Sequence, residues 1–427
     1  MNVQDLPRKI NATDQLVVCF DVSKEKLDGY AIHVRRGAVD REITVSLDRR
    51  ADQIEEQLYE LADYANRHDL SGLCVVCEPT GGYDEELLRL ARQQGHETAY
   101  VNTEHTAKMS TVESGDTGKT DRSDARAMSL IAAVDRTQDR RDLAGKYGRP
   151  RELGQIYDDS SQQATRARTR FHDVLKQLFC GYEKSASFLF DKTGAAVMEE
   201  YAWDPEAILE DGYEQFCERI KAHVKRARWA TLKALYKQAR RSARMQWLEH
   251  YRLLWKRRLK QLWTDYKRYT RRKEQAGQRI THLYQQLQEQ GKVPPPFEKV
   301  STLQLGRLVG ELGPLDDFDC WEEVQKYVGL NLRECQSGDY EGELKITKKG
   351  RPLARKILGQ MAYQLVQDEE LYGEYYRQKQ DRGMPGPKAL VAVMRKLLKL
   401  IVGLYKSDRP YDPERVFTCR SQHAHAG

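Results

Sequence analysis

Long hydrophobic runs are missing from the sequence and cysteine is scarce, and each shortage excludes a class of protein. No apolar stretch approaches the roughly 18 residues that a membrane-spanning helix requires. The segment from Met1 to Asp14 has no apolar run of the signal-peptide type, so we expect no export. Eight cysteines in 427 residues are too few for a disulfide framework and indicate a reducing compartment. We therefore expect a cytoplasmic protein without a membrane partner.

The net charge is small, but the cations are distributed unevenly. The chain has 71 Lys and Arg against 64 Asp and Glu, a formal net charge of +7. Between Arg219 and Lys273, however, 20 basic residues stand against two acidic ones, Glu249 and Asp265. This segment therefore carries +18, which leaves −11 for the rest of the chain. Such separation of charge indicates a polyanionic partner, and nucleic acid is the first candidate.

The first 150 residues alternate between short apolar runs and amphipathic segments. Short apolar runs bounded by turn residues are typical of strands, and apolar residues three and four positions apart are typical of helices. The order of these segments predicts one mixed sheet with helices on its faces and a polar loop before the last helix. The expected strands are Leu16–Asp21, Tyr30–Val34, Glu42–Ser46, Leu73–Cys77 and Glu97–Asn102, and the expected helices are Ala51–His68, Tyr83–Gln94 and a segment from about Asp121.

From about residue 151 the pattern becomes helical and stays so to about residue 290. Apolar residues recur at helical spacing along 251–269, which predicts a long helix in a coiled coil. The triple proline at 294–296 ends this region. We expect an α/β domain (1–150), a basic helical coiled-coil region (151–293), a mainly helical C-terminal domain (294–417) and a disordered tail (418–427).

Four carboxylates occupy positions that suit a metal site. Asp21 and Glu78 follow buried strands, and Asp121 and Asp124 lie three positions apart on one expected helix. Converging carboxylates bind Mg²⁺ or Mn²⁺, which supports phosphoryl transfer. Each acid taken alone is better explained as a cap of a turn or a helix N-terminus. The four together favour the metal site.

The basic segment is the second candidate site. Cations neutralise phosphates, and aromatic rings stack on unpaired bases. A solvated coiled-coil surface is the alternative, and the helical spacing of the aromatic residues favours a packing seam for them. For the cations, the imbalance of charge favours nucleic acid. The candidate contacts are Arg226, Arg240, Arg241, Lys256, Arg257, Arg258, Lys267 and Arg268.

Ser337 is the third candidate. It lies in Gln336-Ser-Gly338, a polar break between expected helices. Four cations that suit a phosphate follow it, namely Lys348, Lys349, Arg351 and Arg355. A Ser-Gly pair by itself indicates only a turn.

Two blocks of motifs resemble one family, the DEDD transposases of the insertion sequence 110/1111 family, also called bridge recombinases. The first block resembles the family's resolvase-type (RuvC-like, RNase H fold) domain and supplies its Asp, Glu, Asp, Asp set in order. The second resembles the family's C-terminal transposase domain, whose serine is a nucleophile. The motifs are Phe20–Lys24, Cys77–Tyr83 and Lys119–Ala125 in the first block, and Phe318, Tyr327–Leu330, Gln336–Gly338, Ile346–Gly350 and Ala389–Lys396 in the second.

The resemblance implies an RNA-guided DNA recombinase. Its expected catalytic residues are Asp21, Glu78, Asp121 and Asp124, which would bind Mg²⁺ or Mn²⁺, and Ser337 as the nucleophile. It implies a structured bridge RNA and donor and target double-stranded DNA as partners, a homo-oligomer (dimer or tetramer), and a nucleoid-associated place in a prokaryotic cytoplasm. Two alternatives stay open. A structure-selective metal-dependent nuclease would not need Ser337, and a non-catalytic RNA-binding scaffold would not need the metal.

Overall fold

The computed structural model describes most of the chain. The described residues are 7–8, 15–35, 38–114, 121–133, 137–138, 146–244, 249–333, 336–337, 340–341, 345–407 and 411–412. The predicted disordered tail, 418–427, lies outside them. The chain divides into two compact units. The first unit comprises residues 1–147, 291–304 and 311–427, and the second comprises 148–290 and 305–310.

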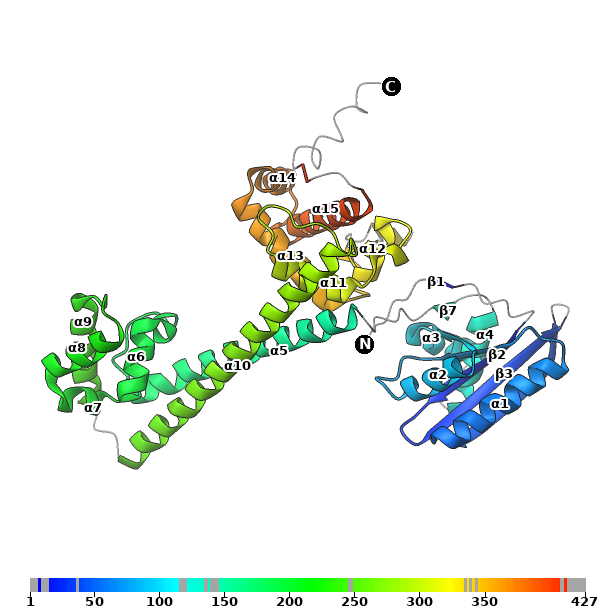
Figure 1. The fold of residues 1–427 in the computed structure, drawn as a ribbon, viewed down its shortest axis with the longest axis horizontal. Helices are drawn as coiled ribbons and strands as arrows, with labels where there is room; N and C mark the ends of the chain where they lie inside the picture. Colours follow the sequence, from blue (N-terminus) through cyan, green and yellow to red (C-terminus); the bar gives the residue numbers. More distant parts are fainter. Residues whose placement is uncertain are drawn as a thin grey trace, which may run out of the picture. The chain divides into compact units, whose positions relative to one another are not determined.

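A seven-stranded mixed sheet organises the N-terminal part of the first unit (Figure 1). Its strand order is β1 (Pro7–Arg8), β7 (Thr137–Gln138), β6 (Glu97–Tyr100), β5 (Leu73–Cys77), β2 (Leu16–Val22), β3 (Lys26–Arg35) and β4 (Ala38–Asp48). Strands β2, β3 and β4 form an antiparallel meander, whereas β5 runs parallel to β2, and β6 runs parallel to β5. The predicted mixed sheet is confirmed.

Helices cover both faces of this sheet because its central strands are apolar on both sides. On one face Val18 and Phe20 of β2 pack with residues of α1 (Ala51–Arg67) and α2 (Asp84–Gln93). On the other face Val17 and Cys19 pack with α4 (Asp121–Ala133). Successive side chains of a strand point to opposite faces, so the unbroken apolar run of β2 supplies two cores.

The polar loop expected between Asn102 and Asp121 is in part a helix, α3 (Thr103–Ser114). The side chain of Asn102 accepts a hydrogen bond from the backbone N–H of Glu104 at 2.9 Å, which begins the helix. The side chains of α3 that are buried include Thr106 and Ser110, which are one helical turn apart. Because its buried positions are polar, α3 has no apolar periodicity and the sequence pattern missed it.

The second unit pairs two long helices and carries a helical subdomain between them. Helices α5 (Gly148–Leu178) and α10 (Glu249–Glu289) pack along one another in opposite directions (Figure 1). The subdomain contains a short 3₁₀ turn, η1 (Phe188–Phe190), and the helices α6 (Lys192–Tyr201), α7 (Pro205–Glu210), α8 (Gly212–His223) and α9 (Trp229–Ala243).

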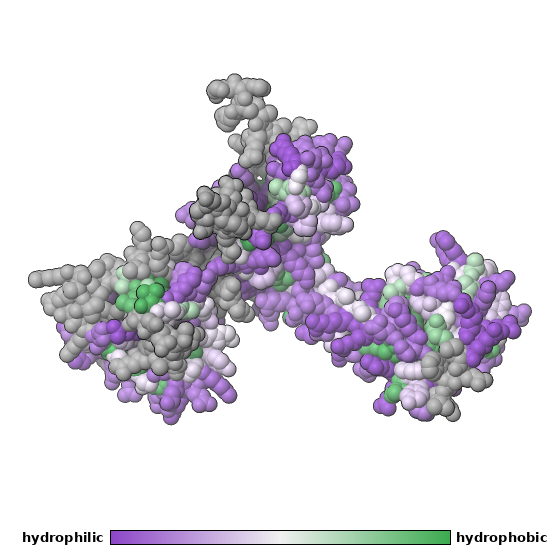
Figure 2. All heavy atoms as spheres, turned by 180° about the vertical axis from the view of Figure 1, so that it is seen from behind, coloured by the Kyte–Doolittle hydropathy of each residue, from purple (hydrophilic) through white to green (hydrophobic). Residues whose placement is uncertain are grey.

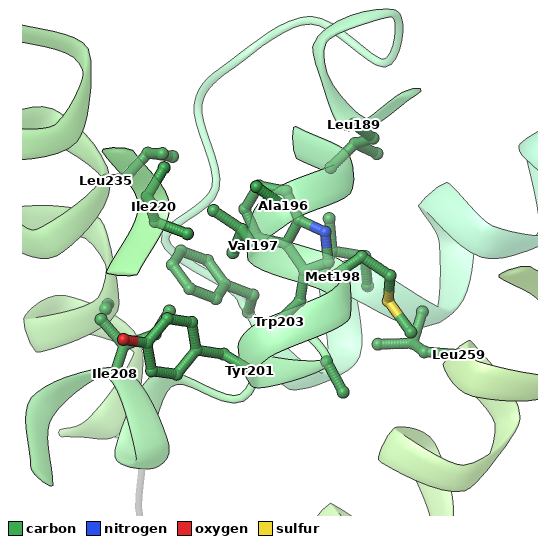
Figure 3. Packing of buried hydrophobic residues seen from close by; sticks show 14 of the residues in the cluster. Leu189, Ala196, Val197, Met198, Tyr201, Trp203, Ile208, Ile220, Leu235 and Leu259 are labelled. Atoms are coloured by element: carbon green, nitrogen blue, oxygen red, sulfur yellow. The ribbon is translucent and has the colours of Figure 1, made fainter. Parts of the chain in front are cut away.

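Trp203 lies at the centre of the subdomain core (Figure 3). Its side chain is fully buried, and its ring meets Phe179 and Tyr182 edge-on, with ring centroids 5.7 and 5.5 Å apart. Leu259 and Trp263 of α10 are buried in the same cluster. Part of the predicted apolar seam of α10 therefore packs inside this unit.

The C-terminal part of the first unit is mainly helical, as predicted. Two short antiparallel strand pairs interrupt it: β8 (Leu332–Arg333) pairs with β11 (Lys345–Ile346), and β9 (Gln336–Ser337) pairs with β10 (Tyr340–Glu341). Its helical elements are η2 (Leu315–Asp317), α12 (Trp321–Val328), α13 (Pro352–Asp368), α14 (Glu370–Asp381) and α15 (Gly386–Lys406). Helix α11 (Thr302–Leu312) has its ends in this unit, and its residues 305–310 belong to the second unit.

The surface agrees with the absence of long apolar runs. On the face seen in Figure 2, the described residues are mainly hydrophilic, with small scattered apolar areas. Across the described parts of the chain, no helix combines the length and apolar character needed to cross a membrane.

Candidate active site

Asp21 and Glu78 are brought together at one edge of the sheet. In the parallel pair of β2 and β5, Phe20 stands opposite Cys77. Asp21 is the next residue after Phe20, and Glu78 is the next after Cys77, so the two acids follow neighbouring positions about 4.8 Å apart, the spacing of adjacent strands. Both are half-buried and therefore remain within reach of a ligand.

Helix α4 covers the face on which these acids lie. Asp21 continues the alternation of Val17 and Cys19, which pack against Ala125 and Met128 of α4. Asp124, beside Ala125, is half-buried. For Asp121, the first residue of α4, only the backbone is described. All four predicted acids thus belong to or directly follow elements that pack together, and the side chains of three of them are described.

The donor chemistry of this edge fits a divalent cation. Two carboxylates side by side at strand ends supply the hard oxygen ligands that Mg²⁺ and Mn²⁺ prefer. Among the side chains that the structure describes, no three His, Cys, Asp or Glu residues form a group that could hold a metal ion. The side chain of Asp121 is not among those described.

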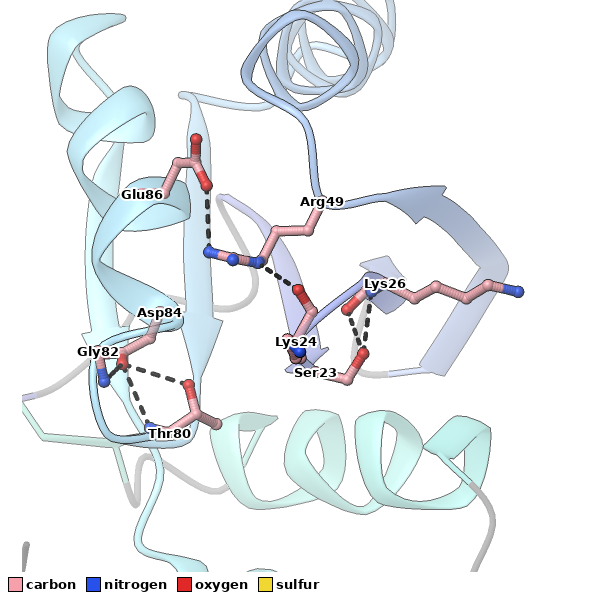
Figure 4. A network of polar contacts seen from close by, with 8 residues as sticks. All are labelled: Ser23, Lys24, Lys26, Arg49, Thr80, Gly82, Asp84 and Glu86. Atoms are coloured by element: carbon pink, nitrogen blue, oxygen red, sulfur yellow. Dashed lines mark hydrogen bonds and ion pairs between the residues drawn. The ribbon is translucent and has the colours of Figure 1, made fainter.

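The loop after Glu78 is fixed by a buried acid that the sequence analysis did not single out (Figure 4). The Oδ1 atom of Asp84 accepts hydrogen bonds from the backbone N–H of Gly82 at 3.1 Å and from Thr80, whose N–H and hydroxyl lie at 3.3 and 3.2 Å. The hydroxyl of Tyr100 donates to the other oxygen, Oδ2, at 2.6 Å. Asp84 is only 4% exposed, so these bonds replace its hydration and hold the loop to β6.

These hydrogen bonds also set the ionisation of Asp84. Burial alone would raise the pKa of its carboxyl, but the hydrogen bonds from Tyr100 and from backbone N–H groups outweigh burial and lower the pKa below its usual value. The folded state therefore favours the charged form. The resulting stability is fully present above the unfolded pKa of about 3.9 and is lost as the pH falls through the lower folded pKa.

We expect Asp84→Ala to destabilise the protein by about 2 to 4 kcal/mol, because the buried Tyr100 hydroxyl and the loop N–H groups lose their acceptor. Denaturant unfolding at neutral pH measures this change, and Glu56→Gln, which changes an exposed acid on α1, is the matched control.

Asp84→Asn should flatten the loss of stability between about pH 5 and 3 relative to the parent chain. Parallel pH profiles would contradict the assignment of this ionisation to Asp84.

Arg49 connects the loop after β2 with helix α2 (Figure 4). Its Nε donates to the backbone carbonyl of Lys24 at 2.9 Å, and its Nη1 lies 3.2 Å from a carboxylate oxygen of Glu86. Its guanidinium also lies over the ring of Tyr83, 5.0 Å from the centroid. The segments that follow Asp21 and Glu78 are therefore held to one another by a single side chain. No local sequence pattern indicates this contact, since its partners lie on separate elements.

Ser337 lies on strand β9, directly opposite Tyr340 on β10. Only the backbone of this pair is described. Two residues separate Ser337 from Tyr340, and the outer pair, β8 with β11, has the same antiparallel sense. The polar break expected here is therefore a β-hairpin, with Ser337 at the pair nearest its tip.

The base of this hairpin is tied to helix α12. The hydroxyl of Thr347 donates to the side-chain oxygen of Asn331 at 2.6 Å, and the backbone N–H of Thr347 donates to the Asn331 carbonyl at 2.9 Å. Gly329 has φ of 79°, and a Cβ there would lie 2.4 Å from the carbonyl oxygen of Lys349. Gly329 thus allows both the left-handed end of α12 and the close approach of the returning strand.

The cations that follow Ser337 have different surroundings. Arg351 is 9% exposed and pairs with buried Glu311 at 3.0 Å. Arg355 donates to the backbone carbonyl of Val328 at 2.8 Å, and burial lowers the pKa of its guanidinium. Lys348 is exposed and Lys349 is half-buried. The two arginines stabilise the base of the hairpin in this conformation. Lys349 pairs with Glu104 of α3, so Lys348 is the accessible cation.

Several of the predicted nucleic-acid contacts in the basic segment already have carboxylate partners. The ammonium of Lys256 lies 2.9 Å from buried Asp204. On α10, exposed Lys267 pairs with Glu199 of α6 at 3.5 Å, and exposed Arg268 pairs with Asp265 of the same helix at 3.0 Å. Arg241 of α9 pairs with Glu183. Arg226, Arg240, Arg257 and Arg258 are exposed and make no ion pair with the described side chains.

Comparison with known families identifies the class of protein. A model of the DEDD transposases of IS110 type matches residues 18–180, and a model of the transposases of the IS116/IS110/IS902 family matches residues 300–377. The two matches together cover more than half of the chain and include Asp21, Glu78, Asp121, Asp124 and Ser337. The protein is a DNA transposase, an enzyme of DNA recombination. It belongs to the IS110 family of DEDD transposases. A comparison with curated proteins gave no match.

Proposed function

We propose that the protein is an RNA-guided DNA recombinase that cleaves and rejoins donor and target DNA under the direction of a structured bridge RNA. The observation that carries this proposal is the adjacency of Asp21 and Glu78 at parallel strand ends, in a chain that belongs to a DEDD transposase family. The +18 segment supports a large polyanionic partner. The family supports a homo-oligomer, a dimer or tetramer.

The N-terminal part is proposed to be a resolvase-type (RuvC-like, RNase H) catalytic domain. The strand order β4–β3–β2–β5–β6 supports this fold, because an antiparallel meander is followed by two parallel strands and the acids lie at the central strands. The proposed functional parts are a catalytic domain (1–150), a basic helical region (151–293) and a transposase domain with the serine (294–417).

Asp21, Glu78, Asp121 and Asp124 are the proposed ligands of Mg²⁺ or Mn²⁺. A bound divalent cation would neutralise charge that develops on a phosphate during cleavage. The chain itself contributes the position of these acids. The parallel register aligns Asp21 with Glu78, the Asp84 network fixes the loop after Glu78, and Arg49 ties that loop to the turn after Asp21.

Ser337 is the proposed nucleophile. Its Oγ would form a bond to the phosphorus of a DNA phosphodiester, the serine proton would be removed, and a deoxyribose oxygen would leave and take up a proton. The phosphoserine preserves one phosphoester bond, so a second DNA hydroxyl can reverse the step and rejoin a strand without an external energy source. The hairpin position of Ser337 supports this role, since the tip of a hairpin can reach a DNA strand.

The direct test of the function is to sequence the RNA that co-purifies with the full-length protein and to mix that complex with donor and target duplexes. Strand exchange that depends on the RNA supports the proposal. Cleavage without exchange would indicate a metal-dependent nuclease instead, and binding without either reaction would indicate an RNA-binding scaffold.

A further inference from the structure

The helical subdomain between α5 and α10 lies outside both family matches. The first match ends at residue 180 and the second begins at residue 300, whereas α6 to α9 occupy residues 192–243. This subdomain has its own apolar core around Trp203. It is therefore a folded element whose role the family matches do not specify.

Helix α9 presents a stripe of exposed cations along one face. Lys233, Lys237, Arg240 and Arg244, the last being the residue that ends the helix, are spaced by four, three and four positions, the spacing of a single helix face. The stripe extends over about 16 Å at 1.5 Å per residue. From Trp229 to Arg244 the sequence contains no acidic residue. None of these four cations makes an ion pair with a described residue.

The core fixes the direction in which this stripe points. Leu232, Leu235 and Ala239 of α9 are fully or almost fully buried in the cluster that contains Trp203. Rotation of the helix would expose these side chains, so the cationic face must lie toward solvent. The loop before α9 has two more exposed cations, Lys225 and Arg226.

The acids of the subdomain pair with more cations of α10 than of α9. Buried Asp204 pairs with Lys256, and Glu206 pairs with Arg252. Glu199 of α6 pairs with Lys267. On α9, Arg241 lies at the side of the stripe and, alone among the described cations of this helix, pairs with a carboxylate, that of Glu183. The cations of the α9 stripe therefore keep their positive charge, as do the exposed Arg257 and Arg258 of α10.

We propose that the α9 stripe binds the phosphate backbone of a nucleic-acid duplex independently of sequence. A rigid row of ammonium and guanidinium groups suits a regular backbone, since each cation replaces a condensed counterion. The stripe itself contains no aromatic side chain. Trp229, the first residue of α9, is 58% exposed, and the ammonium of Lys221 already lies over its ring, 3.0 Å from the ring centroid. Without a row of free rings, the surface lacks the stacking platforms that bind single strands. This proposal deepens the proposed function, because it assigns nucleic-acid binding to one face of one subdomain.

The test compares two double variants of the full-length protein that each remove two positive charges. Lys233→Gln with Lys237→Gln neutralises the unpaired stripe, and Lys267→Gln with Arg268→Gln neutralises two paired cations of α10. Affinity for RNA and DNA duplexes of equal length and sequence is measured over a series of salt concentrations. The α9 variant should lower the slope of log K against log salt by about two units and weaken binding on the order of tenfold at physiological salt. The α10 variant should lower the slope by less than one unit.

Each outcome has a defined meaning. A change with RNA duplex alone assigns the stripe to the guide RNA, a change with DNA duplex alone assigns it to the substrate, and either supports the proposal. Lys233→Arg with Lys237→Arg should retain the parent slope, since the charge is kept. Equal effects of the α9 and α10 variants, or an unchanged slope with both duplexes, would overturn the proposal. Strand exchange is not needed for this measurement, so its result is independent of the test of the recombinase function.

Discussion

Asp21→Asn and Glu78→Gln are each expected to abolish DNA cleavage while leaving the protein folded. The parallel register places these acids at neighbouring strand ends, where two negative charges repel one another unless a cation lies between them. The neutral amides have nearly the same size, so they remove this repulsion without leaving a cavity. Loss of a metal ligand should reduce the rate by at least about a hundredfold to a thousandfold, given the several kcal/mol that a cation contributes to phosphoryl transfer.

Cleavage of labelled DNA in the presence of Mg²⁺ measures this effect, and denaturant unfolding checks the fold. Glu56→Gln, which changes an exposed acid on α1 in the same domain, should retain cleavage. The two site variants should have unfolding midpoints equal to or above that of the parent chain. Cleavage at the parental rate by both site variants would exclude the metal site at this edge.

The apolar pattern was sufficient to predict the sheet because its strands are buried on both faces. Strands β2 and β5 are continuous apolar runs, and such runs leave little choice of element. The adjacency of Asp21 and Glu78 follows from the same runs, since each acid comes at the end of one of them. The pattern failed where polar residues are buried, as in α3, whose covered face includes Thr106 and Ser110.

The contacts that position the site could not be predicted from the sequence. Asp84 is held by Tyr100, 16 residues away, and Arg49 reaches Glu86, 37 residues away. Such hydrogen bonds depend on the tertiary fold and have no local period. The hairpin of Ser337 was missed for a different reason: each of its strands contains two residues, too few for an alternating pattern.

The structure separates the predicted nucleic-acid contacts into cations that already have a carboxylate partner and cations that do not. A count of charges in the sequence cannot make this distinction. A count of charges treats Lys256 and Arg257 alike, yet Lys256 pairs with a buried carboxylate and Arg257 is exposed. Neutralising Lys256 would leave buried Asp204, among the described cations, with only the longer contact to Arg252 at 3.8 Å, which destabilises the fold and complicates the interpretation of a binding assay. The exposed, unpaired cations are therefore the informative positions for studies of nucleic-acid binding.

Ser337→Ala is expected to abolish both covalent attachment to DNA and recombination while RNA and DNA binding persist. A serine hydroxyl attacks phosphorus slowly at neutral pH unless a base, a cation or a preorganised site assists it. The base of the hairpin is held by the bonds between Asn331 and Thr347 and by Arg355, which donates to the Val328 carbonyl at the end of α12. Exposed Lys348 near that base is available to stabilise charge on a phosphate.

The measurement is to mix the protein–RNA complex with labelled DNA, denature it and look for label on the protein. The parent chain should form an adduct that survives denaturation, and Ser337→Ala should form none. Ser407→Ala, at the end of α15, changes another exposed serine of the C-terminal part and should keep the adduct. Asp21→Asn should also lose the adduct if the carboxylate edge and Ser337 act on the same phosphate, even though its serine is intact. Recombination by Ser337→Ala at the parental rate would show that the hydroxyl is not the nucleophile, and the hairpin would then serve only to hold DNA.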